Sequence, residues 1–150
     1  MAVERPQFYT PHMLLTETMG WDQARADAAP IRFAVFVDEQ KVPAEIELDE
    51  HDAACLHAIA RSEGRAVGTG RLLPDGHIGR MAVLKAWRGQ GVGAAMLTVL
   101  IDAARARGDR AVALSAQTHA LGFYRRFGFT NEGPEYIEAG IPHQAMRRVF

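Results

Sequence analysis

Residues 79 to 94 read GRMAVLKAWRGQGVGA, and this stretch decides the fold. A β-prone segment at residues 81–84 precedes a bend that holds three glycines, and the bend opens into an apolar-periodic helix. Because glycine has no Cβ, a ligand can approach the backbone closely at such a bend. The first turn of the helix adds amide groups without a partner inside the helix, together with the positive end of the helix dipole. With Arg88 beside it, this combination predicts a site for the phosphate or diphosphate of a cofactor.

The glycines alone leave several interpretations open. A Walker A loop is excluded because no Gly-Lys-Ser/Thr follows at the required spacing. Gly89, Gly91 and Ala94 match a loosened dinucleotide fingerprint, which requires an acidic residue about 20 positions later, after the next strand. That strand, residues 111–114, is followed by Ser-Ala-Gln. A plain glycine turn that binds nothing is a further alternative.

A second motif narrows the choice. Arg88, Gly91 and Gly93 match the pattern Arg/Gln-x-x-Gly-x-Gly/Ala after a hydrophobic strand, and a later strand is followed by ALGFYRRFGF at residues 120–129. Together, in this order, the two motifs resemble the GNAT superfamily of acetyl-coenzyme A-dependent N-acyltransferases. Residues 31–43 (IRFAVFVDEQKVP) and 140–143 (GIPH) are similar to its ElaA-like branch. The resemblance covers nearly the whole chain.

Length and composition are those of one ordinary globular domain. The chain has 150 residues, of which 48% are apolar and 23% charged, and we expect a single domain over residues 1–150. With 17 basic and 18 acidic residues, it lacks the charge that would attract nucleic acid or an anionic membrane. The single cysteine, Cys55, cannot form an internal disulfide. Without a signal peptide or a membrane-spanning apolar run, we expect a cytoplasmic protein.

Hydrophobic periodicity and turn residues predict an α/β fold. The expected elements are a lead-in at residues 6–12, strands at 13–16, 53–61, 65–73 and 111–114, helices at 21–29, 30–37 and 91–107, an acid-rich loop at 41–52, and two final strands within 129–150 joined by a loop at 132–142. The strand, helix and strand within residues 78–114 form a crossover with parallel strands. The apolar face of the long helix is Val92, Met96, Val99, Leu100 and Ala103. We expect a mixed, mostly antiparallel sheet flanked by helices, as the resemblance to the acyl-CoA N-acyltransferase fold also implies.

The resemblance implies acetyl-coenzyme A (acetyl-CoA) as cosubstrate, with its diphosphate on the glycine loop. The pantetheine arm would pair with the main chain of Met81 and Val83, in the manner of an added strand. The residues expected to contact the cosubstrate are Met81, Ala82, Val83, Arg88, Gly89, Gln90, Gly91, Val92, Gly93, Ala94 and Gln117.

Tyr124 is the predicted catalytic residue. A thiol has a pKa of about 8.5 and a phenol one of about 10, so a positioned tyrosine can donate a hydrogen bond or a proton to a departing thiolate. The catalytic tyrosine of the GNAT superfamily lies at this place in the second motif. The alternative is that Tyr124 is one more packed aromatic residue of that segment.

The base is left open. A lysine-like amine is neutral in only about one molecule in 2,500 at pH 7, so its proton must be removed before it attacks. Many members of the superfamily carry a glutamate on the strand before the glycine loop, but residues 77–80 read HIGR here. The candidates are Glu39, Glu47, His57 and His143.

The acceptor is expected to be a primary amine of a small molecule or a peptide. The acids at positions 45, 47, 49, 50 and 52 either form a solvated face or attract a cationic amine. Arg71 lies in the acceptor pocket or pairs with one of these acids, and Gln40 and Glu47 are further candidate acceptor contacts. Homodimers are common in the superfamily, so a homodimer is an open expectation here.

Other chemistries fit less well. A thiol hydrolase built on Cys55 and His57 has no supporting motif, and no Gly-x-Ser-x-Gly elbow exists. The spacing of Asp49, His51, Asp52 and His57 matches none of the zinc patterns, so no metal is expected. Two alternative functions stay open: a non-catalytic module that binds or senses acyl-CoA and, as a weaker alternative, a nicotinamide-dependent oxidoreductase.

Overall fold

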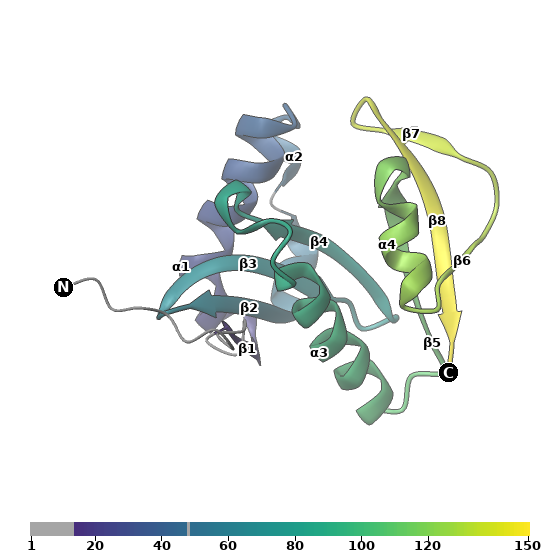
Figure 1. The fold of residues 1–150 in the computed structure, drawn as a ribbon, viewed down its shortest axis with the longest axis horizontal. Helices are drawn as coiled ribbons and strands as arrows, with labels where there is room; N and C mark the ends of the chain where they lie inside the picture. The colour runs from purple at the N-terminus through teal and green to yellow at the C-terminus, as the bar shows by residue number, and fades with distance from the viewer. Residues whose placement is uncertain (1–13, 48) are drawn as a thin grey trace, which may run out of the picture.

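The computed structural model describes residues 14–47 and 49–150, and their strands form one sheet (Figure 1). Its order is β1-β2-β3-β4-β5-β8-β6, with β7 paired to β8. The strands are β1 (Leu14–Met19), β2 (Leu56–Ser62), β3 (Arg65–Leu72), β4 (His77–Val83), β5 (Ala111–Gln117), β6 (Thr130–Asn131), β7 (Tyr136–Glu138) and β8 (Ile141–Val149). The helices are α1 (Trp21–Arg32), the π-helix η2 (Phe33–Glu39), α2 (Ala44–Glu47), α3 (Val92–Ala106), α4 (Leu121–Arg126) and the short 3-10 helices η3 (Glu50–Ala54), η4 (Lys85–Trp87) and η5 (Thr118–Ala120).

The junction between β4 and β5 shapes the molecule. These strands are parallel, whereas the other neighbouring pairs are antiparallel. The expected mixed, mostly antiparallel sheet is confirmed. The parallel ladder joins only His77 to Ala113 and Ile78 to Leu114. From Gly79 onward β4 and β5 diverge, so one edge of β4 has no strand beside it in the described chain.

Alternating side chains of β2 contact two different helices. Ala58 and Ala60 belong to the core under α3, whereas Ile59 packs with Ala24 and Ala28 of α1. Because successive side chains of a strand point to opposite faces, α1 and α3 cover opposite faces of the sheet (Figure 1). None of the helices described in the chain is long and apolar enough to cross a membrane.

The long helix α3 lies very close to β3. A Cβ at Gly68 would lie 2.8 Å from Val92 Cγ1 and 2.9 Å from Met96 Cε, so any larger residue would require these side chains to shift. The buried residues of α3 are Val92, Met96, Leu97, Leu100, Ile101 and Ala104. Three of the five residues predicted for this face are therefore buried, while Val99 and Ala103 lie at its half-buried margin.

The predicted start of a second helix at Pro30 is wrong. Helix α1 runs through Pro30 and continues directly into η2, where the amide of Gln40 donates to the carbonyl of Val35 at 3.0 Å. Proline removes one backbone hydrogen bond inside a helix. Burial of Ile31 and Val35 against Ala82 of β4 offsets this loss, so packing rather than local propensity decides the helix.

Two predicted loops contain further elements. The acid-rich loop holds α2 and η3, so β2 begins at Leu56 rather than at position 53. The loop predicted at 132–142 contains β7, which forms a hairpin with β8 through Ala139 and Gly140, both at positive φ. The exposed side chains of β7 show no apolar alternation, and this left the strand unpredicted. The lead-in at 6–12 and the first predicted strand residue, Met13, lie outside the described residues.

Candidate active site

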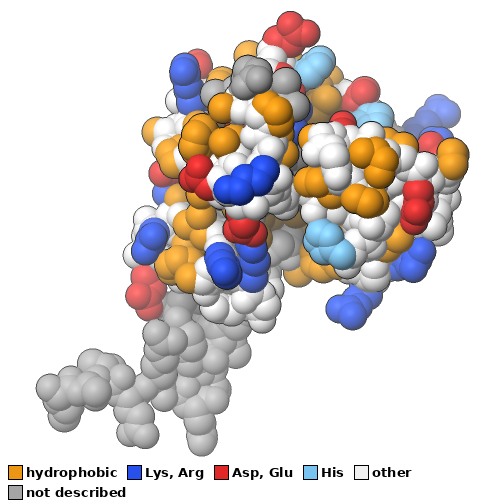
Figure 2. Space-filling view, turned by 90° about the horizontal axis from the view of Figure 1, so that it is seen from above, with side chains coloured by type: hydrophobic (Ala, Val, Ile, Leu, Met, Phe, Trp, Pro, Cys, Tyr) orange, Lys and Arg blue, Asp and Glu red, His pale blue; other side chains and the backbone are white. Residues whose placement is uncertain are grey.

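A cavity of about 1070 Å³ lies where β4 and β5 diverge. Its walls come from η2, β4, the start of α3, β5, α4 and the β7–β8 hairpin. Seen from above, a furrow separates the half that holds α1 and β4 from the half that holds α4 and β8 (Figure 2). Acidic and basic side chains are interspersed on this face (Figure 2). The divergence therefore leaves a binding space rather than a packed core between the two strands.

The glycine loop offers backbone groups to a ligand at one end of this cavity. Gly89 and Gly91 have positive φ values of 76° and 84°, and a Cβ on either would meet no described atom within 4 Å. Gly91 is the N-cap of the 15-residue α3 and supplies no side-chain cap. The first-turn amides of Val92, Gly93 and Ala94 have no acceptor one turn earlier in the helix. An open surface, uncapped amides and the helix dipole fit a diphosphate.

Arg88 connects this loop to η2. Its Nε donates to the carbonyl of Val83 at 3.0 Å, and its terminal nitrogens donate to Glu39 at 2.6 and 2.9 Å. The hydrogen bond from Arg88 lowers the pKa of the Glu39 carboxyl. The Arg88 guanidinium, which is predicted to face the diphosphate, is thus already paired with the Glu39 carboxylate.

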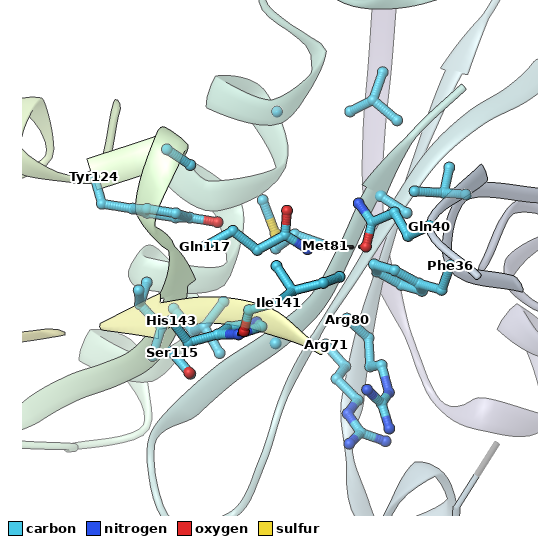
Figure 3. Close-up of a pocket in the computed structure, with 18 of the residues that line it drawn as sticks. Phe36, Gln40, Arg71, Arg80, Met81, Ser115, Gln117, Tyr124, Ile141 and His143 are labelled. Carbon is cyan, nitrogen blue, oxygen red and sulfur yellow. Dashed lines mark hydrogen bonds between the residues drawn. The ribbon is translucent and has the colours of Figure 1, made fainter. Parts of the chain in front are cut away.

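Tyr124 projects from α4 into the middle of the cavity. Figure 3 shows its hydroxyl pointing toward the space beside Gln117 and Met81. The rings of Phe123 and Phe129 hold it edge-on, with centroids 5.1 and 6.1 Å away. Its hydroxyl has no hydrogen-bond partner among the residues that the structure describes, and burial raises the pKa of its phenol. Tyr124 therefore stays protonated at neutral pH and has a donor available for a ligand.

A glutamine pair joins the two walls. The Gln117 amide, at the end of β5, donates to the side-chain oxygen of Gln40, which follows η2, at 2.9 Å (Figure 3). Both residues line the cavity. The bond joins residues 77 positions apart in sequence and so links η2 to β5 across the cavity.

His143 lines the cavity from β8. Its Nδ1 lies 2.7 Å from the carbonyl of Ile141, so this nitrogen carries a proton and donates, and Nε2 is the acceptor nitrogen of the neutral ring. The ring stacks on Tyr136 at 6.0 Å, and the Tyr136 hydroxyl is hydrogen-bonded to Ser115. Glu138 lies 3.8 Å from Nε2. An oriented imidazole with an acceptor nitrogen is suited to take a proton.

Comparison with known proteins identifies this arrangement. A family profile described as "Acetyltransferase (GNAT) domain" matches residues 22–150. The chain belongs to the GNAT acetyltransferase family. Membership supports N-acyltransferase activity and, in general, an acyl-CoA cosubstrate.

Relatives and solved structures agree with this assignment and confirm the expected fold. The uncharacterized N-acetyltransferase YjcF of Bacillus subtilis is 39% identical over 126 residues, which cover 81% of this chain and 90% of YjcF. ElaA of Escherichia coli is 33% identical over 126 residues, covering 79% and 82% of the two chains, and its crystal structure has a TM-score of 0.80. An acyl-CoA N-acyltransferase from Pseudomonas aeruginosa has a TM-score of 0.81 and 33% identity over 91% of this chain and 99% of its own. The resemblance to GNAT proteins and to ElaA is thereby confirmed.

Six of the eleven residues predicted to contact the cosubstrate line this GNAT cavity, five of them on β4, the glycine loop and the start of α3 and one, Gln117, on β5. Those that line it are Met81, Ala82, Val83, Arg88, Gly93 and Gln117. Gly89, Gln90, Gly91, Val92 and Ala94 form the adjoining loop and first helical turn. The Val92 side chain is buried in the core, so only its backbone is available, and the Gln90 side chain donates to the Ala86 carbonyl at 3.1 Å.

Two of the four candidate bases are corrected by the structure. Glu47 is 3% exposed and pairs with Arg32 at 2.6 Å, away from the cavity walls. His57 is buried, bonds through Nε2 to the Asp52 carbonyl at 2.8 Å and packs on Trp21, and burial lowers the pKa of its imidazole. Neither reaches a substrate in the cavity. Glu39 and His143 line the cavity and stay candidates.

Three acids of the acid-rich segment are paired with arginines. Asp52 accepts from both Arg32 and Arg71 at 2.8 Å, and Asp49 accepts from two nitrogens of Arg71 at 2.7 and 2.9 Å. Glu47 completes the cluster through Arg32. Hydrogen bonds from Arg71 hold the pKa of Asp49 far below its usual range. These three acids are therefore neutralised by arginines and are not free to attract a cation, whereas Glu50 is exposed. Glu47 as an acceptor contact is corrected for the same reason.

Both roles considered for Arg71, a place in the pocket and a pair with an acid, are found in the structure, and Arg80 is a further site residue that the sequence did not suggest. Arg71 pairs with the acids and also lines the cavity. Arg80, beside it on β4, lines the same end at a φ of 48°. A left-handed arginine within a strand leaves no mark in the sequence. In residues 14–47 and 49–150, no group of three or more His, Cys, Asp or Glu side chains is placed to hold a metal ion.

Proposed function

We propose that this GNAT protein transfers an acetyl group from acetyl-CoA to a primary amine by direct attack. One observation carries the proposal: a single cavity is lined by Gly93 at the start of α3, by the unpaired edge of β4 and by Tyr124, and the uncapped amides that follow Gly91 adjoin it. The amine nitrogen forms a bond to the thioester carbon, the carbon–sulfur bond breaks, and the sulfur leaves with the bonding pair.

Backbone groups bind the cosubstrate in this proposal. The amides of Val92, Gly93 and Ala94 receive the diphosphate, and the pantetheine arm runs along β4 beside Met81 and Val83. Alternate N–H and C=O groups of a strand point to each side, so the edge that β5 leaves after Gly79 can pair with the amides of the arm. The thioester then reaches the level of Tyr124.

Tyr124 donates to the leaving sulfur. Burial raises its pKa above the ordinary value of about 10, so the phenol keeps its proton throughout the neutral and mildly alkaline range. Its hydrogen bond stabilises negative charge that develops on sulfur only as the bond breaks. Ionisation of this residue should therefore not reduce the rate below about pH 10.

His143 removes the proton from the amine. Holding a lysine-like amine neutral at pH 7 costs about 4.6 kcal/mol without a base. The Nδ1–H of His143 is committed to the Ile141 carbonyl, which leaves Nε2 to accept a proton from the amine, directly or through one water. Glu39 is less suited, because Arg88 holds both of its oxygens.

The test is turnover by the Tyr124→Phe variant, measured as thiol release from acetyl-CoA over a panel of primary amines. Loss of a general acid should lower kcat by about 10²-fold or more. CoA binding by the variant, measured by calorimetry, is the control, because a folded variant that lacks only the phenol donor should still bind CoA. Unchanged turnover in Tyr124→Phe would remove the residue from the mechanism. A wild-type protein that binds CoA but acetylates no amine would instead be a non-catalytic acyl-CoA module.

A further inference from the structure

The end of the cavity away from the glycine loop is built from arginine. Arg71 of β3 and Arg80 of β4 line this end together with Asp49, and their guanidinium groups lie side by side (Figure 3). Arg80 and Val83 are three residues apart on β4, about 10 Å along a strand. Arg88, which donates to the Val83 carbonyl, lies at one end of this strand edge, and Arg80 lies at the other. Tyr124 lies on the opposite wall between them.

A β-bulge places Arg80 in this position. On β3, Thr69 pairs with Ala82 and Arg71 pairs with Gly79, so Gly70 alone opposes the two residues Arg80 and Met81. Arg80 adopts the left-handed conformation, which a residue with a Cβ rarely takes. Bulges redirect side chains and concentrate next to binding sites, and backbone strain of this kind persists where the surroundings fix it. The bulge turns an arginine into the cavity at the point where the strands part.

Charges are arranged in layers around this end. Glu47, Asp52 and Arg32 form a buried layer that does not line the cavity. Arg71 and Arg80 lie at the wall with one acid, Asp49, whose oxygens already accept from Arg71 at 2.7 and 2.9 Å and from Arg80 at 3.4 Å. Arg71 also donates to Asp52 of the buried layer at 2.8 Å, so three arginines balance three acids over both layers. The cavity wall itself is lined by two guanidinium groups and by one carboxylate that already accepts from both of them.

One donor of the Arg71 side chain, its Nε–H, is not used in these ion pairs. Its side chain is 8% exposed, and its Nε–H has no hydrogen-bond partner among the described residues. A buried polar group without a partner is unusual in folded proteins. Arginine presents its donors in a planar fork that matches the two oxygens of a carboxylate. The chemistry of this wall suits a bound carboxylate, and no acid there is available to receive a cation.

We infer that the acceptor amine also carries a carboxylate, which binds at Arg71 and Arg80 and directs the amine toward the thioester. The inference rests on the proposed acetyl transfer, since it names the acceptor class for that reaction. Arg80 is a specificity residue here: it binds the remote end of the acceptor and takes no part in bond making.

Matched pairs of acceptors test the inference. Each ω-amino acid from glycine to 6-aminohexanoate is compared with its carboxamide, as is each of the common amino acids, by thiol release from acetyl-CoA. The longer ω-amino acids are the cleanest pairs, because a distant carboxylate changes the basicity of the amine little. The preferred acceptors should be carboxylates, with kcat/KM at least tenfold above that of their amides. Preference for amides, or for cationic amines without a carboxylate, overturns the inference.

Variants then assign the effect to the wall. Arg80→Asn removes the charge with a residue that tolerates the left-handed conformation, and Arg147→Asn, an exposed arginine on β8 outside the cavity, is the control. Arg80→Asn should raise KM for carboxylate acceptors at least tenfold, leave kcat and the rates with the amides unchanged, and Arg80→Lys should restore part of the effect. An equal loss for carboxylates and amides would mean that Arg80 is only structural.

Binding separates failure of the inference from failure of the proposed function. Calorimetric titration of the CoA complex with glutarate should release heat that is lost in Arg80→Asn and kept in Arg147→Asn. If CoA binds and no amine is acetylated, the proposed function fails, and the glutarate titration alone decides the carboxylate site. Absence of glutarate binding, or equal binding by Arg80→Asn, overturns it.

Discussion

Replacing Gly91 with alanine should separate backbone strain from ligand binding. Gly91 has a φ of 84°, and the added methyl group would meet no described protein atom within 4 Å. The loss of stability should therefore be only the strain of a left-handed alanine, about 1–2 kcal/mol, or about 2–8 °C in Tm for a chain of this length. Gly64 is a matched control, because it lies in the β2–β3 turn with a φ of 82° and equally open surroundings. Both variants should lose the same stability in the absence of a ligand.

The two variants should differ once CoA is added. At a concentration 100 times Kd, a ligand stabilises the folded state by about 2.7 kcal/mol. If the methyl group at Gly91 blocks access to the amides and weakens binding 100-fold, the same concentration gives only about 0.4 kcal/mol. Thermal unfolding with and without CoA measures this, and only Gly91→Ala should lose the shift. Equal ligand-induced shifts in Gly91→Ala and Gly64→Ala would refute the placement of the diphosphate.

Three further results follow from the charged groups. Glu39→Gln should tighten CoA binding up to about fivefold, because it removes a carboxylate that competes for Arg88, and the exposed pair it breaks is worth at most about 1 kcal/mol; a weaker Kd by calorimetry would contradict this. Arg32→Met should cost about 3–5 kcal/mol in chemical denaturation, since it leaves the buried Glu47 without its cation and Asp52 with only one of its two arginines; a loss below 1 kcal/mol would be inconsistent with the buried cluster. Burial lowers the pKa of His57, so as the pH falls the imidazole is protonated in the unfolded chain before it is protonated in the folded one. The contribution of His57 to the free energy of unfolding is therefore fully present above about pH 6.5 and falls below it by up to about 1.4 kcal/mol per pH unit. This slope should flatten in His57→Phe, and an unchanged slope would assign it to other groups.

Local features were predictable from the sequence. The glycine loop and α3 were predicted because the glycines, the apolar period and the second motif each act within a few residues. The turn at Glu63 and Gly64 was predictable for the same reason, and both residues have the positive φ that a tight hairpin requires. Tyr124 was found by its place in a motif, and the structure puts its hydroxyl in the cavity.

Features that depend on distant partners were not predictable. The acids near position 50 gave no sign that their partners are Arg32 and Arg71, which lie 15 to 22 positions away in the chain. The course of the helix through Pro30 depends on packing against β4, and not on the local sequence. Arg80 lies in the site because of a β-bulge. A bulge depends on how two strands pair, so the sequence of β4 alone does not predict it. His143 was one of four equal candidates until the structure placed Glu47 and His57 outside the cavity.

The proposed chemistry depends on the binding of an acyl-CoA by the backbone of the glycine loop. Titration calorimetry of the wild-type protein with acetyl-CoA, CoA and NAD tests it most directly. We expect heat with both acetyl-CoA and CoA at micromolar Kd, about −8 kcal/mol of binding free energy, and none with NAD. No heat with either thiol cosubstrate, or heat with NAD alone, would contradict it.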